Sequence, residues 1–309
     1  MTGKISRKKL VVILGPTASG KTWLAVELAR KFNGEIISAD SRQVYRGMDI
    51  GTGKDLSEYK EIPYHLIDIV NPRDNFNVAK YQKLAYAAID DVLRRGKLSL
   101  LVGGTGLYID AVIKGYEFNN IKYSILNIKK IRQKLNQQTL IQLLSKLKRV
   151  DLITYNQIDK KNRRRVQRAM EIFYETGRTK SETDKKSAPD YDILILGITF
   201  PLEKIYRKID SRLETRLKEG MIKEVKGLRK KGVSWKKLEE FGLEYRYVAR
   251  YLRGLITHEE LVEQLKNAIH HFAKRQLTWF KRNKDIIWIG NKMQAQKLVN
   301  NFIKKKPSV

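Results

Sequence analysis

The chain has 309 residues, 42% of them hydrophobic and 31% charged, which is enough for one large domain or two modest ones. Its 63 Lys and Arg residues against 33 Asp and Glu give a formal charge of +30, which favours a polyanionic partner such as nucleic acid, although a general surplus of surface lysine would also raise the charge. The absence of cysteine excludes disulfides, thiolate catalysis and zinc–cysteine sites, and the four histidines predict no structural metal.

The N-terminal segment is basic, with Lys4, Arg7, Lys8 and Lys9, and leads into a short apolar run. That run ends at Gly15, which is too soon for a signal peptide or a membrane span. We therefore expect a cytoplasmic protein with no membrane partner.

The apolar run over 10–14 predicts a buried strand, and the period of Leu24, Leu28 and Phe32 predicts a helix. The loop between them matches G-x-x-x-x-G-K-[ST], in which backbone N–H groups and a helix N-terminus surround phosphate oxygens. Its lysine adds a mobile charge and its threonine hydroxyl suits Mg2+, and an incidental glycine turn would not explain the whole arrangement. The sequence predicts a phosphate or diphosphate site at Gly15, Pro16, Thr17, Ala18, Ser19, Gly20, Lys21 and Thr22.

Strand-like and helix-like segments alternate along the rest of the first 115 residues and resume near the C-terminus. Such alternation predicts an α/β fold with a doubly wound parallel sheet, whose ligands lie at the carboxyl ends of the strands. Gly15, Asp40 and Gly103 each follow a strand, so we expect them to line one crevice. The predicted strands cover 10–14, 35–40, 65–70, 98–102, 192–200 and 286–289, with a helix over 78–95.

The segment 116–189 differs from its surroundings, since it is rich in Lys, Arg, Asn and Gln and its apolar residues have helical spacing. We interpret it as a small helical insertion, while 1–115 and 190–309 form the core around the phosphate loop, with C-terminal helices. Further helices are predicted over 204–231, 235–252 and 257–282, the last opened by a capping box at Thr257 and Glu260.

Polar residues crowd the end of the second strand, from Asp40 to Lys54. A carboxylate there can accept a proton or hold a metal, and the following amides, hydroxyls and cations can bind a base edge or a phosphate. An aspartate that only caps the following turn explains the position equally well. The glycine turn at 103–106 is a weak signal by itself.

Taken together, these motifs resemble the tRNA dimethylallyltransferases, also called tRNA isopentenyltransferases. The likeness spans nearly the whole chain with the motifs in order, and the zinc finger of eukaryotic relatives is missing, as in the bacterial type. The stretches that carry it are 15–22, 40–52, 102–108, 162–169, 242–246 and 273–279.

The resemblance implies transfer of a dimethylallyl group from dimethylallyl diphosphate to the N6 amine of the adenine beside the anticodon, on its 3′ side. It implies Asp40 as general base, Thr22 as a ligand of Mg2+, and Arg212 as a group that reaches the diphosphate. For Arg212 a helix-surface ion pair with Asp210 or Glu214 is nearly as well supported by the sequence.

The resemblance also implies that the target adenine flips out of its loop and that 1–115 and 190–309 form the P-loop catalytic core, while the insertion 116–189 binds the tRNA anticodon stem-loop. We expect the protein to be a monomer. A merely solvated helix face would be the default interpretation of the arginines at 163–168 if they stood alone. The residues expected to contact tRNA are Asp40, Ser41, Arg42, Gln43, Val44, Tyr45, Gly104, Thr105, Arg164, Arg165, Val166, Gln167, Arg168, Tyr245 and Arg246.

Three other functions remain open at this stage. An adenylate isopentenyltransferase would prenylate free AMP or ATP, but it would not need a basic insertion. A nucleotide kinase would bind ATP at the same loop and use 163–168 as an arginine-bearing lid. A plain RNA-binding protein would leave the loop and Asp40 without a purpose.

Overall fold

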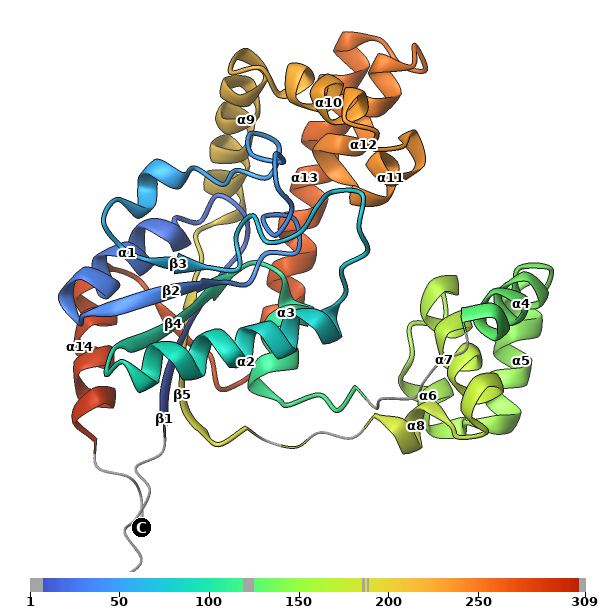
Figure 1. Cartoon of the computed structure of the whole chain (residues 1–309), viewed down its shortest axis with the longest axis horizontal. Helices are drawn as coiled ribbons and strands as arrows, with labels where there is room; N and C mark the ends of the chain where they lie inside the picture. The colour runs from blue at the N-terminus through green and yellow to red at the C-terminus, as the bar shows by residue number, and fades with distance from the viewer. Residues whose placement is uncertain (1–7, 119–124, 185–186, 188, 306–309) are drawn as a thin grey trace, which may run out of the picture. The chain divides into compact units, whose positions relative to one another are not determined.

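The computed structural model describes residues 8–118, 125–184, 187 and 189–305, so Lys4 and Arg7 lie outside the described residues. The chain divides into two compact units (Figure 1). Unit 1 comprises 1–113 and 189–309, and unit 2 comprises 114–188. Unit 2 interrupts unit 1 between a helix and a strand, and each unit has a hydrophobic core of its own.

Unit 1 is built on a six-stranded parallel sheet in the order β3–β2–β4–β1–β5–β6. The central strand β1 pairs with β4 and β5, placing Leu10 between Ser99 and Ile193. The predicted parallel α/β sheet is therefore confirmed. The strands are β1 (Lys8–Leu14), β2 (Gly34–Ser38), β3 (Tyr64–His65), β4 (Leu98–Gly103), β5 (Tyr191–Ile198) and β6 (Ile287–Ile289).

Helices cover both faces of the sheet because alternate strand residues point to opposite sides. On one face, Val11 and Ile13 pack with α1 (Lys21–Lys31) and α14 (Lys292–Lys304). On the other, Leu10, Val12 and Leu14 pack with α2 (Val78–Arg94) and α3 (Gly106–Ile113). Residues 10–14 of β1 are therefore buried on both faces of the sheet, as expected for a continuous apolar run.

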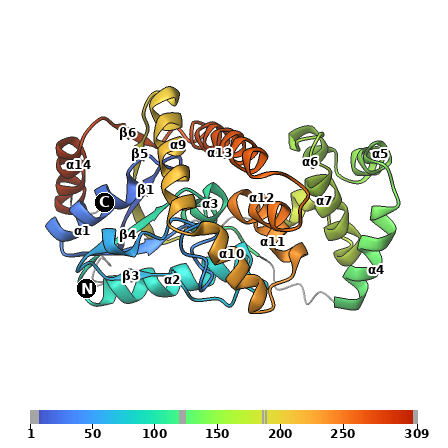
Figure 2. The ribbon, with the colours of Figure 1, turned by 90° about the horizontal axis from the view of Figure 1, so that it is seen from above.

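Five further helices of unit 1 gather beside the sheet and pack on the loop after β2 (Figures 1 and 2). The buried residues Val44, Tyr45 and Met48 of that loop belong to their hydrophobic cluster. The helices are α9 (Leu202–Lys218), α10 (Met221–Lys230), α11 (Trp235–Phe241), α12 (Leu243–Leu252) and α13 (His258–Phe280).

Three sequence-based expectations about these elements were wrong. The single helix predicted over 204–231 is broken at Gly220, whose φ is +103°, and that over 235–252 is broken at Gly242, whose φ is +76°. Glycine adopts this backbone conformation without steric cost, so each break ends one helix and starts the next. The strand predicted over 65–70 stops after His65 because Leu66 and Asp68 also have positive φ. The capping box at Thr257 and Glu260 is confirmed.

Unit 2 is helical throughout its described elements. Its core is small and packs helices α5 and α7 against α4, with Leu143, Leu147 and Val166 fully buried. Side-chain caps begin several helices, among them Thr139 in a capping box and Asn162 at the start of α7. The helices are α4 (Ile125–Asn136), α5 (Leu140–Val150), α6 (Leu152–Gln157), α7 (Arg163–Thr176) and α8 (Lys180–Thr183).

Candidate active site

The phosphate-type loop connects β1 to α1, as the sequence predicts. Ala18 and Gly20 have positive φ, of 60° and 79°, so the loop turns sharply before the first helical residue, Lys21. Gly15 is required by a close approach, since a Cβ there would overlap the carbonyl oxygen of Ile198 at the end of β5. Pro16 and Ser19 are buried within the loop. The N–H groups at the N-terminus of α1 lie at the end of this loop, and N–H groups in such a position favour binding of an anion.

A cavity of about 240 Å³ in unit 1 joins the ends of three strands. Of the three residues expected to share one crevice, Asp40 and Gly103 line this cavity and Gly15 does not, although Lys21 of the same loop does. Side chains of α9, α12 and α13 line it as well. The other predicted site residues along its wall are Thr17, Ala18, Thr22, Ser41, Arg42, Gln43, Gly104, Thr105, Arg212 and Tyr245.

Gln276 of α13 ties the loops around this cavity together, a role that the sequence analysis did not predict. Its Oε1 accepts a hydrogen bond from the Thr17 backbone N–H at 2.9 Å, and its Nε2 donates to the Gly104 carbonyl at 2.8 Å. Thr105 in turn accepts from the Ser41 N–H at 3.0 Å. The sequence offered two signals: Gln276 lies in the stretch 273–279 that carries the family resemblance, and its amide stands between Ala273 and Leu277 on a largely apolar helix face.

Asp40 fits both sequence interpretations at once. Its Oδ1 accepts from the backbone N–H groups of Arg42 at 2.8 Å and of Gln43 at 3.3 Å, which caps the turn after β2. The same side chain lines the cavity opposite the phosphate-type loop. The cap fixes the carboxylate at the cavity wall, which a group that accepts a proton from a bound ligand requires.

Lys21 is the cation of the loop, and its Nζ donates to the Pro16 carbonyl at 2.8 Å. Burial lowers its pKa to about 8, while the nearby Asp40 carboxylate acts in the opposite direction and Arg212 adds to the lowering. An anionic ligand would stabilise the charged form of this buried amine, because the anion replaces the hydration that the amine loses on burial.

Arg212 also faces the cavity rather than the helix surface. Its Nη2 donates to Asp55 Oδ2 at 2.5 Å, in the loop that follows Gly53. Asp210, one of the partners that the sequence offered, instead pairs with Lys266 at 3.0 Å and His270 at 2.8 Å. Arg212 therefore belongs to the cluster of groups around the cavity.

Several residues expected to contact RNA have buried side chains. Val44 is fully buried, and Tyr45, 4% exposed, packs against Phe241 with ring centroids 4.9 Å apart. Tyr245 is 1% exposed and donates its hydroxyl hydrogen to Glu224 at 2.7 Å. These side chains stabilise the wall that carries Ser41, Arg42 and Gln43. Tyr245 also lines the cavity, whereas Val44 and Tyr45 do not.

The basic cluster of α7 in unit 2 is not uniform. Arg163 donates to the carbonyls of Leu135, Asn136 and Gln138, so it caps the end of α4. Arg168 pairs with Glu171, and Gln167 bonds Asn136 at 3.0 Å; Val166 is core. Arg164 and Arg165 are exposed, and Arg246, in unit 1, donates its Nε hydrogen to the Glu239 carbonyl. Arg164 and Arg165 are therefore accessible to a ligand in solution, and so is part of Arg168, whose side chain is 43% exposed.

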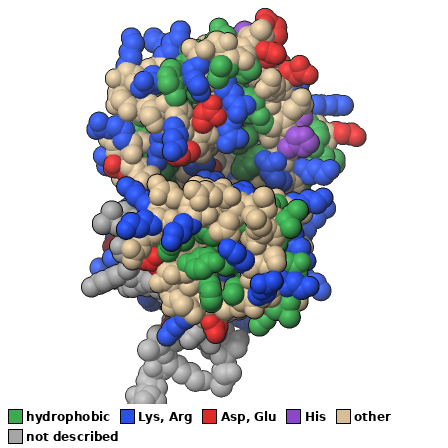
Figure 3. Space-filling model, turned by 90° about the vertical axis from the view of Figure 1, so that its right-hand side faces the viewer, with side chains coloured by type: hydrophobic (Ala, Val, Ile, Leu, Met, Phe, Trp, Pro, Cys, Tyr) green, Lys and Arg blue, Asp and Glu red, His purple; other side chains and the backbone are tan. Residues whose placement is uncertain are grey.

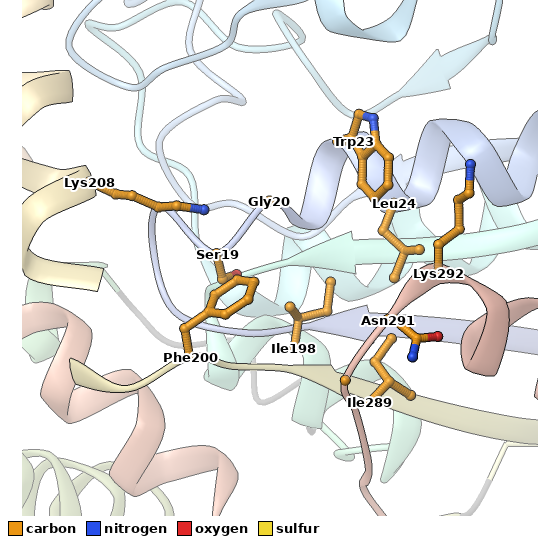
Figure 4. A pocket seen from close by; sticks show the side chains of 11 residues that line it. Ser19, Gly20, Trp23, Leu24, Ile198, Phe200, Lys208, Ile289, Asn291 and Lys292 are labelled. Carbon is orange, nitrogen blue, oxygen red and sulfur yellow. The ribbon is translucent and has the colours of Figure 1, made fainter. Parts of the chain in front are cut away.

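A second and more apolar cavity, of about 350 Å³, lies on another side of the phosphate-type loop (Figure 4). Trp23 of α1 and Phe200 contribute aromatic rings, with Lys292 5.5 Å from the Trp23 ring centroid and Lys208 4.7 Å from that of Phe200. No Asp or Glu is among the residues that line it. The first cavity, by contrast, is lined by the carboxylates of Asp40 and Glu244.

Basic side chains are widespread on the molecular surface, and acidic ones are much less frequent on the face shown in Figure 3. Among the described residues, no helix has the length and apolar character needed to cross a bilayer. The same part of the chain contains no cluster of three or more His, Cys, Asp or Glu side chains suited to a metal ion.

The fold and the cavity define the class of P-loop α/β proteins. Family models described as IPP transferase and isopentenyl transferase match residues 43–283 and 8–62. A tRNA dimethylallyltransferase 1 from Syntrophus aciditrophicus (strain SB) is 46% identical over 299 residues, 94% of this chain and 96% of the relative. A tRNA dimethylallyltransferase 2 from Treponema denticola is 45% identical over 88% of this chain and 91% of the relative. The chain belongs to the IPP transferase family.

Solved structures of tRNA isopentenyl and dimethylallyl transferases also match this chain. A tRNA isopentenylpyrophosphate transferase from Bacillus halodurans matches with a TM-score of 0.71 and 37% identity, over 96% of this chain and 95% of that one. A eukaryotic dimethylallyltransferase, described as acting on tRNA, matches with a TM-score of 0.82 and 27% identity, over 97% of this chain and 80% of that one. The resemblance noted in the sequence is thus confirmed along nearly the full chain.

Proposed function

We propose that this chain transfers the dimethylallyl group of dimethylallyl diphosphate to the N6 amine of the adenine that follows the anticodon in tRNA. The observation that carries the proposal is that a phosphate-type loop and Asp40 line one cavity in a member of the IPP transferase family. The products are N6-dimethylallyladenosine in tRNA and free diphosphate.

The reaction forms a bond between N6 and C1 of the prenyl group and breaks the bond between C1 and the diphosphate oxygen. Asp40 accepts the proton that N6 loses, and the leaving diphosphate keeps the bonding electrons. Lys21, Arg212 and the loop N–H groups stabilise the charge that grows on the leaving group. The polar groups of Ser41 and Gln43, on the same wall as Asp40, hold the flipped adenine.

The oxygen donors of this cavity fit Mg2+, which prefers a few hard protein oxygens together with substrate phosphates. Thr22 lines the cavity and would supply a hydroxyl oxygen, while Asp40 serves as the proton acceptor. Bound to the diphosphate, Mg2+ would neutralise part of its negative charge.

The anticodon stem-loop needs a grip on its phosphates in addition to the base pocket. We assign this grip to Arg164 and Arg165, since they are exposed on α7, with a contribution from Arg168. We further propose that the enzyme acts as a monomer. A tRNA substrate assigns the enzyme to the cytoplasm.

The test is to incubate the protein with unmodified tRNA, dimethylallyl diphosphate and Mg2+, and to analyse the digested tRNA by mass spectrometry. We expect N6-dimethylallyladenosine at the position 3′ to the anticodon. Prenylation of free AMP alone would identify an adenylate isopentenyltransferase, and phosphoryl transfer from ATP would identify a kinase.

A further inference from the structure

Besides Arg42 and Arg212, the first cavity is lined by a third arginine, Arg216, that the mechanism above does not use. Arg216 lies on α9, one helical turn after Arg212, and both line the cavity. Arg216 is only 8% exposed, and its Nη2 is buried without a hydrogen-bond partner in the structure. A guanidinium nitrogen in that state costs stability unless a ligand satisfies it, since buried polar groups are almost always hydrogen-bonded.

The contacts of Arg216 orient it without satisfying it. Its nearest carboxylate is Glu244 of α12, whose Oε1 lies 3.7 Å from Arg216 Nη1, too far for a hydrogen bond. Burial and the neighbouring charge of Arg212 lower the pKa of Arg216, and burial raises the pKa of Glu244. Arg216 is therefore a buried cation whose charge Glu244 balances only weakly. A buried cation of this kind favours binding of an anion.

The backbone at Gly53 allows the two arginines to converge. A Cβ at this position would overlap the guanidinium groups of both Arg212 and Arg216, and the φ of Gly53 is +62°. The turn that carries Gly53 is fixed, because Glu224 accepts hydrogen bonds from the N–H groups of Asp49 and Ile50 at 2.7 and 2.6 Å. A fixed turn without a side chain at Gly53 therefore leaves room for both guanidinium groups at the cavity wall.

We propose that Arg216 is a second arginine for the diphosphate of the prenyl donor, held by Glu244 and acting with Arg212. This rests on the proposed function, and it adds a phosphate-binding residue to the reaction. A phosphate of the tRNA backbone offers the same chemistry, but Arg216 shares its cavity with the phosphate-type loop and Lys21, whereas the exposed arginines of unit 2 suit a polynucleotide better.

The test measures binding of inorganic diphosphate with Mg2+ by titration calorimetry, which needs no turnover. Arg216→Met should weaken binding by about 10- to 100-fold, as expected for loss of a charge-assisted hydrogen bond, and Arg216→Lys should recover part of it. Arg207→Met, an exposed arginine of the same helix, serves as control and should change binding by less than about twofold. The double variant Arg216→Met/Glu244→Gln removes the stranded carboxylate and should bind diphosphate as weakly as Arg216→Met alone.

Steady-state prenyl transfer to tRNA then separates the two phosphate sources. We expect the KM for dimethylallyl diphosphate to rise in Arg216→Met, with the KM for tRNA unchanged. Unchanged diphosphate binding, or a raised KM for tRNA alone, would overturn the assignment, as would a wild-type protein that does not bind diphosphate. If the wild type bound diphosphate but prenylated nothing, the proposed function would fail while the binding role of Arg216 remained measurable.

Discussion

The cations of the two units differ in how they are held. In unit 1, Lys21, Arg212 and Arg216 line one cavity, where Lys21 and Arg216 are desolvated and Arg212 pairs with Asp55. In unit 2, Arg164 and Arg165 stand exposed on α7. Buried, preorganised charges stabilise a developing charge at one place, whereas exposed ones attract a polyanion in a salt-dependent way. We therefore expect changes in unit 1 to alter chemistry and changes in unit 2 to alter tRNA affinity.

The largest effect should come from Asp40. Asp40→Asn retains the oxygen that accepts from the Arg42 N–H, so the turn should persist while the proton acceptor is lost. We expect kcat for prenyl transfer to fall by about 10²- to 10⁴-fold, with tRNA affinity retained. Asp40→Ala, which also removes the turn cap, should be at least as inactive. Near-normal turnover in Asp40→Asn would refute the base assignment.

Lys21 should give the site a pH dependence of binding. Because its pKa is lowered to about 8, the amine loses its charge above that pH, and affinity for inorganic diphosphate should fall by about tenfold per pH unit there. Lys21→Arg stays charged and should flatten this dependence in calorimetric titrations. Asp40→Asn removes a charge that raises the pKa of Lys21, so the affinity for diphosphate should begin to fall at a lower pH than in the wild type. A wild-type profile that is flat from pH 7 to 9.5 would contradict this role.

The exposed pair on α7 should act on tRNA alone. Arg164→Ala/Arg165→Ala should raise the KM for tRNA by about tenfold and reduce the slope of log affinity against log salt by about 0.7 for each phosphate that is no longer neutralised. The KM for dimethylallyl diphosphate should not change. Filter binding over a salt series checks the slope, and equal slopes in variant and wild type would remove α7 from the interface.

A substitution of Arg163 should show that this arginine stabilises unit 2 and does not contact RNA, unlike its exposed neighbours on α7. Since it donates to three carbonyls at the end of α4, Arg163→Ala should destabilise unit 2 by about 1 to 2 kcal/mol. Hydrogen exchange of α4 and α7 amides measures this loss directly. Prenyl transfer at low temperature should keep its wild-type kcat; a reduced kcat with unchanged exchange would assign Arg163 to the substrate instead.

The sequence predicted what depends on local pattern. The loop at 15–22, the parallel sheet and the strand-end position of Asp40 all follow from short segments with their own physical signature. Helix breaks at Gly220 and Gly242 were missed because a single glycine inside an apolar helical period is often tolerated. Their positive φ is imposed by the packing of α9 to α12 against one another.

The rest of the site could not be predicted because it depends on residues that only the fold brings together. Gln276 joins loops at Thr17 and Gly104, which lie more than 170 positions away along the chain. Arg216, Glu244 and Gly53 likewise come from three separate elements. Gln276 and Glu244 lie in stretches that carry the family resemblance, and Gly53 lies in the polar run after Asp40, but no local pattern shows which of these residues meet in the fold.

The most direct test of the account offers the acceptors together. An unmodified tRNA and AMP, at equal concentration, compete for labelled dimethylallyl diphosphate in the presence of Mg2+, with the label followed in each. We predict that the label enters tRNA at the adenine 3′ to the anticodon and that AMP remains unmodified. Label in AMP, or in neither acceptor, would contradict the assignment of this chain as a tRNA-modifying prenyltransferase.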